Sequence, residues 1–148
     1  MKLDELLNQP ADYTVTEKTA KYFQAEFTSN DRIIRFDADQ QYEYNEEDDV
    51  PTGVWEIAFI QPDSNGIGRW DVTRGGKEFE VFATLRKIIM QFFRECQPKE
   101  IRFTAEKGNA NRADLYQKLF NKMLPAGYTL QRDDDSSKLN SKFMIVKE

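Results

Sequence analysis

The stretch Glu78–Gln131, EFEVFATLRKIIMQFFRECQPKEIRFTAEKGNANRADLYQKLFNKMLPAGYTLQ, decides the fold of this chain. Its first part places apolar residues at spacings of three and four, which predicts a long amphipathic helix. These residues are Phe79, Phe82, Leu85, Ile88, Ile89, Phe92 and Phe93. Gln97-Pro98 ends the helix, because proline disfavours helical backbone at the residue before it. We expect this helix to lie across a sheet.

The remainder of the stretch predicts a strand, a second helix and another strand. Glu100–Ala105 has strand character, and the second helix starts after Gly108 with Asn109 or Asn111 as its N-cap. Pro125-Ala126-Gly127 ends that helix, and Tyr128–Arg132 follows as a strand. The residues that we expect to face the sheet from this helix are Leu115, Leu119, Phe120 and Met123.

Alternating apolar residues predict further strands on both sides of this stretch. On the amino-terminal side they are Lys21–Thr28, Arg32–Ala38, Gly53–Ile60 and a short fourth segment, Arg69–Thr73. On the other side Lys142–Val146 pairs antiparallel with Tyr128–Arg132. A strand, a helix and a next strand within about thirty residues favour a parallel crossover.

The sequence therefore predicts one α/β domain over residues 1–148, with a mixed sheet of the α+β kind. Antiparallel strands come first, followed by the long helix, a strand, the second helix and a strand pair. Residues 1–18 are weakly patterned and are expected to form a peripheral arm, with the core in residues 21–148.

Composition excludes several classes of function. The formal net charge is -5, which argues against a nucleic-acid binder because phosphate contacts need clustered Lys and Arg. One cysteine, Cys96, and no histidine exclude an internal disulfide, Cys/His zinc sites and imidazole catalysis. No signal peptide or membrane-spanning run is present, so we expect a soluble, cytoplasmic protein.

Two acidic runs are candidate metal ligands. Glu46–Asp49 and Asp133–Asp135 lack the alternate spacing and central glycine of a calcium loop. Like charges in a row repel one another, so both runs are expected to be solvated loops. The sequence predicts no metal site.

The order of elements resembles the carboxy-terminal two thirds of the GNAT superfamily of acyl-CoA N-acyltransferases, over Lys21–Lys147. The residues that carry the resemblance are Asn109 or Asn111, Ala113, Leu115 and Tyr116, followed by Gly127-Tyr128. The resemblance implies a GNAT-like fold and, if the chain is catalytic, acetyl-CoA as cofactor. It also implies that Tyr116 protonates the leaving thiolate; the alternative for Tyr116 is a core or boundary position.

The resemblance also implies a phosphate site before the long helix. In that family a turn of the form Arg/Gln-x-x-Gly-x-Gly/Ala presents backbone N–H groups to the CoA pyrophosphate, and the family's pantetheine lies in a gap between the fourth and fifth strands. This chain has Arg74, Gly75, Gly76 and Lys77 at the turn, with different spacing, and Asn109 and Asn111 complete the candidate cofactor residues. The alternative is a glycine turn in which Glu78 stabilises the helix start.

A general base would have to be a carboxylate, because there is no histidine. Glu56 is the first candidate and Asp71 the second. Strand alternation places Glu56 opposite Trp55 and Ile57, on a face where burial would make it a stronger base. The alternative for either carboxylate is ordinary exposure on a half-covered sheet.

Two functions follow. One is an acyl-CoA-dependent N-acetyltransferase acting on a small amine or a protein acceptor. The other is a non-catalytic protein-interaction module on a degenerate GNAT-like scaffold. Phe79–Tyr128 also resembles small proteins of tailed bacteriophages, which would place such a module in the host cytoplasm with a protein partner.

Overall fold

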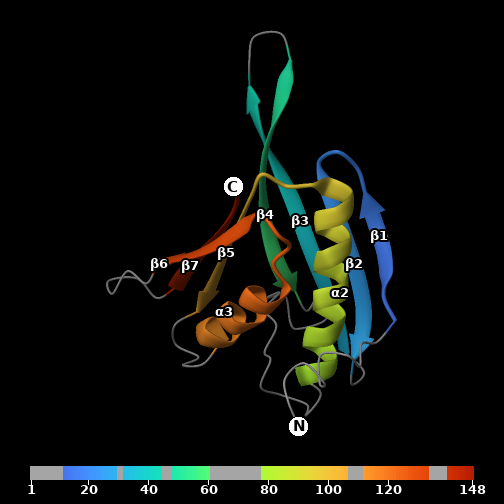
Figure 1. Ribbon diagram of the computed structural model, residues 1–148. Helices are drawn as coiled ribbons and strands as arrows, with labels where there is room; N and C mark the ends of the chain where they lie inside the picture. Colours follow the sequence, from blue (N-terminus) through green and yellow to red (C-terminus); the bar gives the residue numbers. More distant parts are fainter. Residues whose placement is uncertain (1–11, 30–31, 45–47, 61–77, 107–111, 134–139) are drawn as a thin grey trace. The chain divides into compact units, whose positions relative to one another are not determined.

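Two helices and seven strands make up the part of the chain that the computed structural model describes, residues 12–29, 32–44, 48–60, 78–106, 112–133 and 140–148 (Figure 1). The strands are β1 (Thr14–Lys18), β2 (Tyr22–Ser29), β3 (Arg32–Tyr44), β4 (Asp49–Ile60), β5 (Glu100–Glu106), β6 (Tyr128–Asp133) and β7 (Asn140–Lys147). The helices are α2 (Glu78–Cys96) and α3 (Arg112–Met123).

The strands pair in the order β1-β2-β3-β4-β5-β7-β6. β4 and β5 are parallel, whereas β1 with β2, β2 with β3, β5 with β7 and β6 with β7 are antiparallel. The sheet is therefore mixed, and the predicted fold class is confirmed. α2 lies in the chain between the parallel strands β4 and β5. The chain forms two compact units, residues 1–39 with 58–96 and residues 40–57 with 97–148.

The first unit packs α2 against the antiparallel strands. The predicted alternation is confirmed, with Phe23, Ala25 and Phe27 of β2 buried together with Ile34, Phe36 and Ala38 of β3. On α2 the apolar stripe Phe82, Leu85, Ile88, Ile89, Phe92 and Phe93 is buried. The Phe92 ring lies 5.6 Å from that of Phe23 and 5.7 Å from that of Phe36, between centroids. These spacings are those of favourable aromatic pairs.

β1 was not predicted. Its residues alternate weakly and are mostly exposed, so apolar periodicity gives no signal there. Backbone pairing holds it instead, with Val15 opposite Ala25 and Lys18 opposite Phe23. Side chains add two contacts to α2, because Tyr13 donates a hydrogen bond to Gln91 and Lys18 pairs with Glu95. With β1 counted, the predicted third strand is β4, and the predicted Arg69–Thr73 strand lies outside the described residues.

The contact of Lys18 with Glu95 predicts a pH dependence. Hydrogen bonding from Lys18, with a second bond from Gln91, lowers the pKa of Glu95. Because the pKa is lower in the folded state, the stabilisation is present above the pKa of the unfolded chain and is lost as the pH falls through the folded value. Carbon-13 NMR titration should find the Glu95 carboxyl below the ordinary glutamate pKa. Lys18→Met should raise it, and identical titration curves in the two proteins would contradict the contact.

The second unit packs α3 on one face of β5, β7 and β6. Phe120 and Met123 of α3 are buried with Ile101 and Phe103 of β5 and with Phe143 and Ile145 of β7. The ring of Phe103 lies 4.7 Å from that of Phe120 and 4.8 Å from that of Phe143, to which it is parallel within 4°. Trp55 of β4 is in register with Ile101 and is buried too. The face that carries these residues is therefore the covered face of the unit.

Gly53 allows the α2–β5 connection to approach β4. The φ angle of Gly53 is +76°, and its carbonyl accepts a 2.9 Å hydrogen bond from the N–H of Lys99. A Cβ atom at residue 53 would lie 2.8 Å from Cδ and 2.9 Å from Cγ of Lys99. A side chain at this position is therefore both strained and crowded.

We expect Gly53→Ala to lower the free energy of unfolding by more than about 2 kcal/mol, since left-handed backbone alone costs an L-residue about 1–2 kcal/mol. Gly127→Ala is the matched control, because Gly127 has φ +92° but nothing within 4 Å of an added Cβ. Urea unfolding measures both. Equal losses would show that Lys99 moves aside without cost.

Candidate functional site

The predicted site residues fall mostly outside the described part of the chain. Those outside it are Asp71, Arg74, Gly75, Gly76, Lys77, Asn109 and Asn111. Tyr116 lies within α3, but its side chain is not among those described. Glu56 is thus the predicted residue whose surroundings the structure gives.

Glu56 is exposed, so the structure shows the second of its two predicted environments, ordinary exposure on the sheet, and not a buried apolar face. Its neighbours in β4, Trp55 and Ile57, are 3% and 6% exposed and occupy the covered face. Side chains alternate along a strand, so Glu56 points to the opposite face. We call this opposite face of β4, β5, β7 and β6, with Glu56, Arg102, Met144, Gln131, Lys142 and Asp133, the open face.

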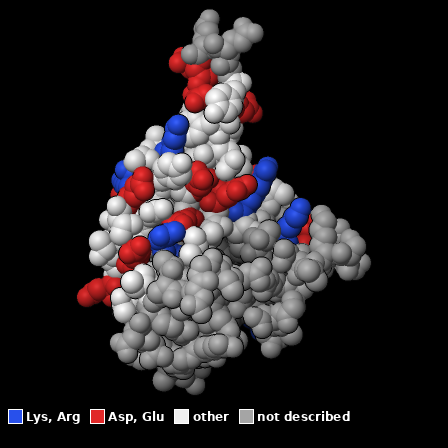
Figure 2. Space-filling model, turned by 180° about the vertical axis from the view of Figure 1, so that it is seen from behind, with Lys and Arg blue, Asp and Glu red and all other residues white. Residues whose placement is uncertain are grey.

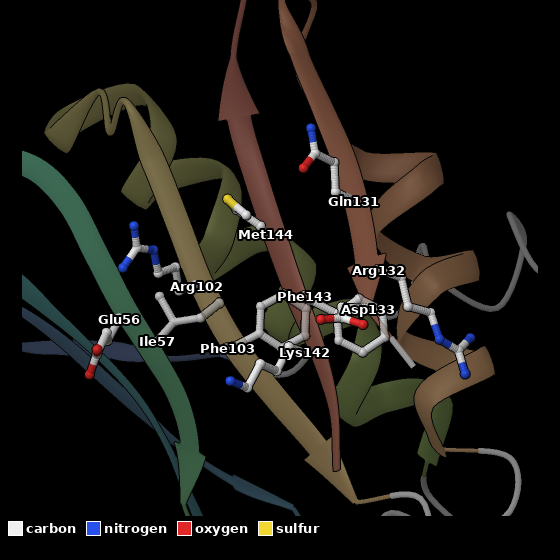
Figure 3. A pocket seen from close by; sticks show the side chains of 10 residues that line it. All are labelled: Glu56, Ile57, Arg102, Phe103, Gln131, Arg132, Asp133, Lys142, Phe143 and Met144. Atoms are coloured by element: carbon white, nitrogen blue, oxygen red, sulfur yellow. The ribbon is translucent and has the colours of Figure 1, made fainter. Parts of the chain in front are cut away.

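A cavity of about 670 Å³ lies beside Glu56 and is open to solvent (Figure 3). Side chains from all four strands of the second unit line it. They are Glu56, Ile57, Arg102, Phe103, Gln131, Arg132, Asp133, Lys142, Phe143 and Met144. The volume lies within the range of about 300–1,000 Å³ that is usual for small-molecule sites.

The cavity lies where β4 and β5 cease to pair. Their ladder has three registered pairs, Val54 with Glu100, Trp55 with Ile101 and Glu56 with Arg102. The residues that follow, Ile57 and Phe103, line the cavity. On its other side β5 remains paired with β7 along its whole length, from Glu100 to Glu106. The cavity thus begins at the end of the β4–β5 ladder.

Strand register arranges the open face in two rows. The first row runs Glu56, Arg102, Met144 and Gln131 across β4, β5, β7 and β6. In the second row Lys142 of β7 lies opposite Asp133 of β6 and opposite Thr104 of β5. Directly opposite side chains on one face lie about 4.5–5.5 Å apart at Cβ. Charged groups of both signs therefore border the cavity.

The cationic side chains that line the cavity differ in the contacts they make with other side chains. Nε of Arg102 pairs with the Glu100 carboxylate. Arg132, on the covered face, stacks over the Phe143 ring at 5.6 Å and donates a 2.9 Å hydrogen bond from Nη1 to Gln117 of α3. Neither Glu56 nor Lys142 has an ion pair or a side-chain hydrogen bond within the described residues.

The sequence patterns do not single out Arg102 or Lys142 as site residues. Alternation within Glu100–Ala105 and Lys142–Val146 places each on a definite face of its own strand. It does not give the register, and the register is what brings both residues to the same side of the sheet as Glu56.

Two further titratable groups are structural. Tyr128 donates its hydroxyl hydrogen to the carbonyl of Pro98, and burial raises its pKa. Burial also raises the pKa of the Cys96 thiol at the end of α2. A raised thiol pKa lowers the fraction of reactive thiolate.

On the described part of the face seen in Figure 2, acidic and basic side chains are interspersed. No cluster of three or more Cys, Asp or Glu side chains suited to a metal ion occurs among the described residues. None of the described helices is both long enough and apolar enough to cross a membrane.

Comparison with solved structures finds a similarity of fold. The chain is similar to an acetyltransferase of the GNAT family from Streptococcus pneumoniae, with a TM-score of 0.39 and 11% sequence identity. The similarity covers 88% of this chain and 68% of that one. With so low a TM-score and sequence identity, the similarity carries no information about activity. No family model matches the chain, and no curated protein matches it.

Proposed function

We propose that the chain is an acyl-CoA-dependent N-acyltransferase on a GNAT-like scaffold. The observation that carries the proposal is the end of the β4–β5 ladder at Glu56 and Arg102, with an open cavity directly beyond it. The resemblance noted in the sequence places pantetheine in a gap between the fourth and fifth strands. The order of strands and helices agrees with that resemblance.

The cavity suits an extended ligand with amide groups. Ile57 and Phe103 line it at the end of the ladder, and its other lining residues include charged and polar ones such as Glu56, Gln131 and Lys142. A pantetheine arm is such a ligand, because its amides can continue a hydrogen-bonding ladder beside a strand. The resemblance assigns the CoA pyrophosphate to the turn Arg74–Lys77, which lies outside the described residues.

In the proposed reaction Glu56 is the general base. In the reaction, the acceptor amine attacks the thioester carbonyl carbon, a C–N bond forms and the C–S bond breaks. Glu56 accepts the proton that the amine loses, and Tyr116 donates a proton to the departing sulfur, in the role that the resemblance assigns to it. The products are an amide and free CoA. Exposure of Glu56 at the cavity mouth makes it accessible to an acceptor that arrives from solvent.

Titration calorimetry with acetyl-CoA tests this proposal. We expect micromolar binding that is lost in Gly75→Glu, because the new carboxylate would repel the pyrophosphate. Gly75→Ala is the control, because it also replaces the glycine but adds no charge. It should retain most of the affinity for acetyl-CoA. Absence of binding at millimolar acetyl-CoA would reject the enzyme and leave the protein-interaction module as the function.

A further inference from the structure

Lys142 lies beside the part of β5 that β4 no longer covers. It is in register with Thr104, two residues beyond Arg102, where the β4–β5 ladder ends. Figure 3 shows its ammonium group extending toward β4 and away from Asp133, its cross-strand neighbour. A ligand at the cavity mouth therefore meets the Glu56 carboxylate from β4 and the Lys142 ammonium group from β7.

Arg102 adds a second cationic group at the same mouth. It is a diagonal neighbour of Lys142 on the open face, and such neighbours lie about 7–8 Å apart. The contact between Arg102 and Glu100 uses Nε, and the guanidinium has two further nitrogens that can donate to an anion. On the open face the mouth thus presents two cationic side chains, Arg102 and Lys142, and two carboxylates, Glu56 on β4 and Asp133 on β6.

We infer that the acceptor is an amine that also carries an anionic group, a carboxylate or a phosphate. The amine nitrogen lies toward Glu56, and the anionic group lies between Lys142 and Arg102. The inference rests on the proposed function, and it specifies the class of acceptor. Charge-assisted hydrogen bonds to a carboxylate or phosphate are stronger than neutral ones, so the anionic group should strongly favour binding.

Acceptor assays with matched amines test this inference. The rate of CoA thiol release is measured with 5-aminovalerate and O-phosphoethanolamine, which carry the two kinds of anion. Pentylamine, without the anion, and cadaverine, with a second cation in its place, are the comparison amines. We expect kcat/KM for the better anionic amine to exceed that for both comparison amines by about ten-fold or more, from one charge-assisted contact. Equal or better use of pentylamine or cadaverine would overturn the inference.

Variants assign the effect to the cavity mouth. Lys142→Gln should lower kcat/KM for the preferred anionic amine by about ten-fold or more and leave that for pentylamine unchanged. Lys147→Gln is the matched control, because Lys147 is an exposed lysine of the same strand that does not line the cavity. Asp133→Asn should raise kcat/KM for the anionic amine by removing a competing carboxylate. An equal loss in Lys142→Gln and Lys147→Gln would contradict the assignment.

Titration of the same protein with acetyl-CoA distinguishes failure of the proposed function from failure of the inference about the acceptor. No binding of acetyl-CoA rejects the proposed function, and this inference with it. Binding of acetyl-CoA together with no preference for anionic amines rejects this inference alone.

Discussion

Glu56→Gln should lower kcat for N-acetylation by about 10²-fold or more, the usual contribution of a general base. Glutamine has the shape of glutamate but cannot accept the proton that the amine loses. Because Glu56 is exposed and makes no side-chain hydrogen bond within the described residues, folding should be unaffected. Affinity for acetyl-CoA should stay close to that of the wild type, since the carboxylate acts on the acceptor.

The measurement is the rate of CoA thiol release at saturating acetyl-CoA, with binding followed separately by calorimetry. Glu43→Gln, at an exposed position of β3, is the matched control and should leave kcat unchanged. An unchanged kcat in Glu56→Gln would remove Glu56 from the mechanism. Parallel losses in both variants would point to a general effect of charge.

Phe103→Ala should destabilise the protein by about 3–5 kcal/mol, the range for removing a buried phenylalanine ring. The Phe103 ring lies between those of Phe120 and Phe143, with centroid distances of 4.7 Å and 4.8 Å, and the residue is 6% exposed. Its loss leaves a void between α3 and the sheet. The covered face of the second unit depends on this contact.

Urea unfolding followed by circular dichroism measures the effect. Phe103→Leu is the control, because leucine keeps an apolar side chain in the site and should cost clearly less than alanine. A loss below about 1 kcal/mol in Phe103→Ala would mean that the surrounding side chains collapse into the space without penalty.

The regular elements of this fold could be read from sequence because each carries its own period. The stripe from Phe82 to Phe93 predicts α2, and the alternation around Phe23 and Phe36 predicts β2 and β3; burial in the structure confirms both. β1 could not be predicted in this way, because backbone pairing and the contacts of Tyr13 and Lys18 hold it, with little apolar alternation. These contacts join residues more than seventy positions apart in sequence.

The candidate site could be predicted only in part. Alternation correctly separates Glu56 from Trp55 and Ile57, but it does not say which face of β4 is covered. The covered face is set by packing between elements, as the contact of Phe120 of α3 with Phe103 shows for the neighbouring strand β5. Which residues lie near Glu56 at the cavity mouth depends on the register between strands. The sequence of a single strand does not determine that register.

Chemical-shift mapping of backbone amides with acetyl-CoA tests the central claim most directly, because it reports both binding and its location. If the acyl end of CoA enters the gap beyond the β4–β5 ladder, the amides of Glu56, Ile57, Arg102 and Phe103 should shift most among the described strands. No shifts at millimolar acetyl-CoA, or shifts that leave these four amides unchanged, would contradict the account.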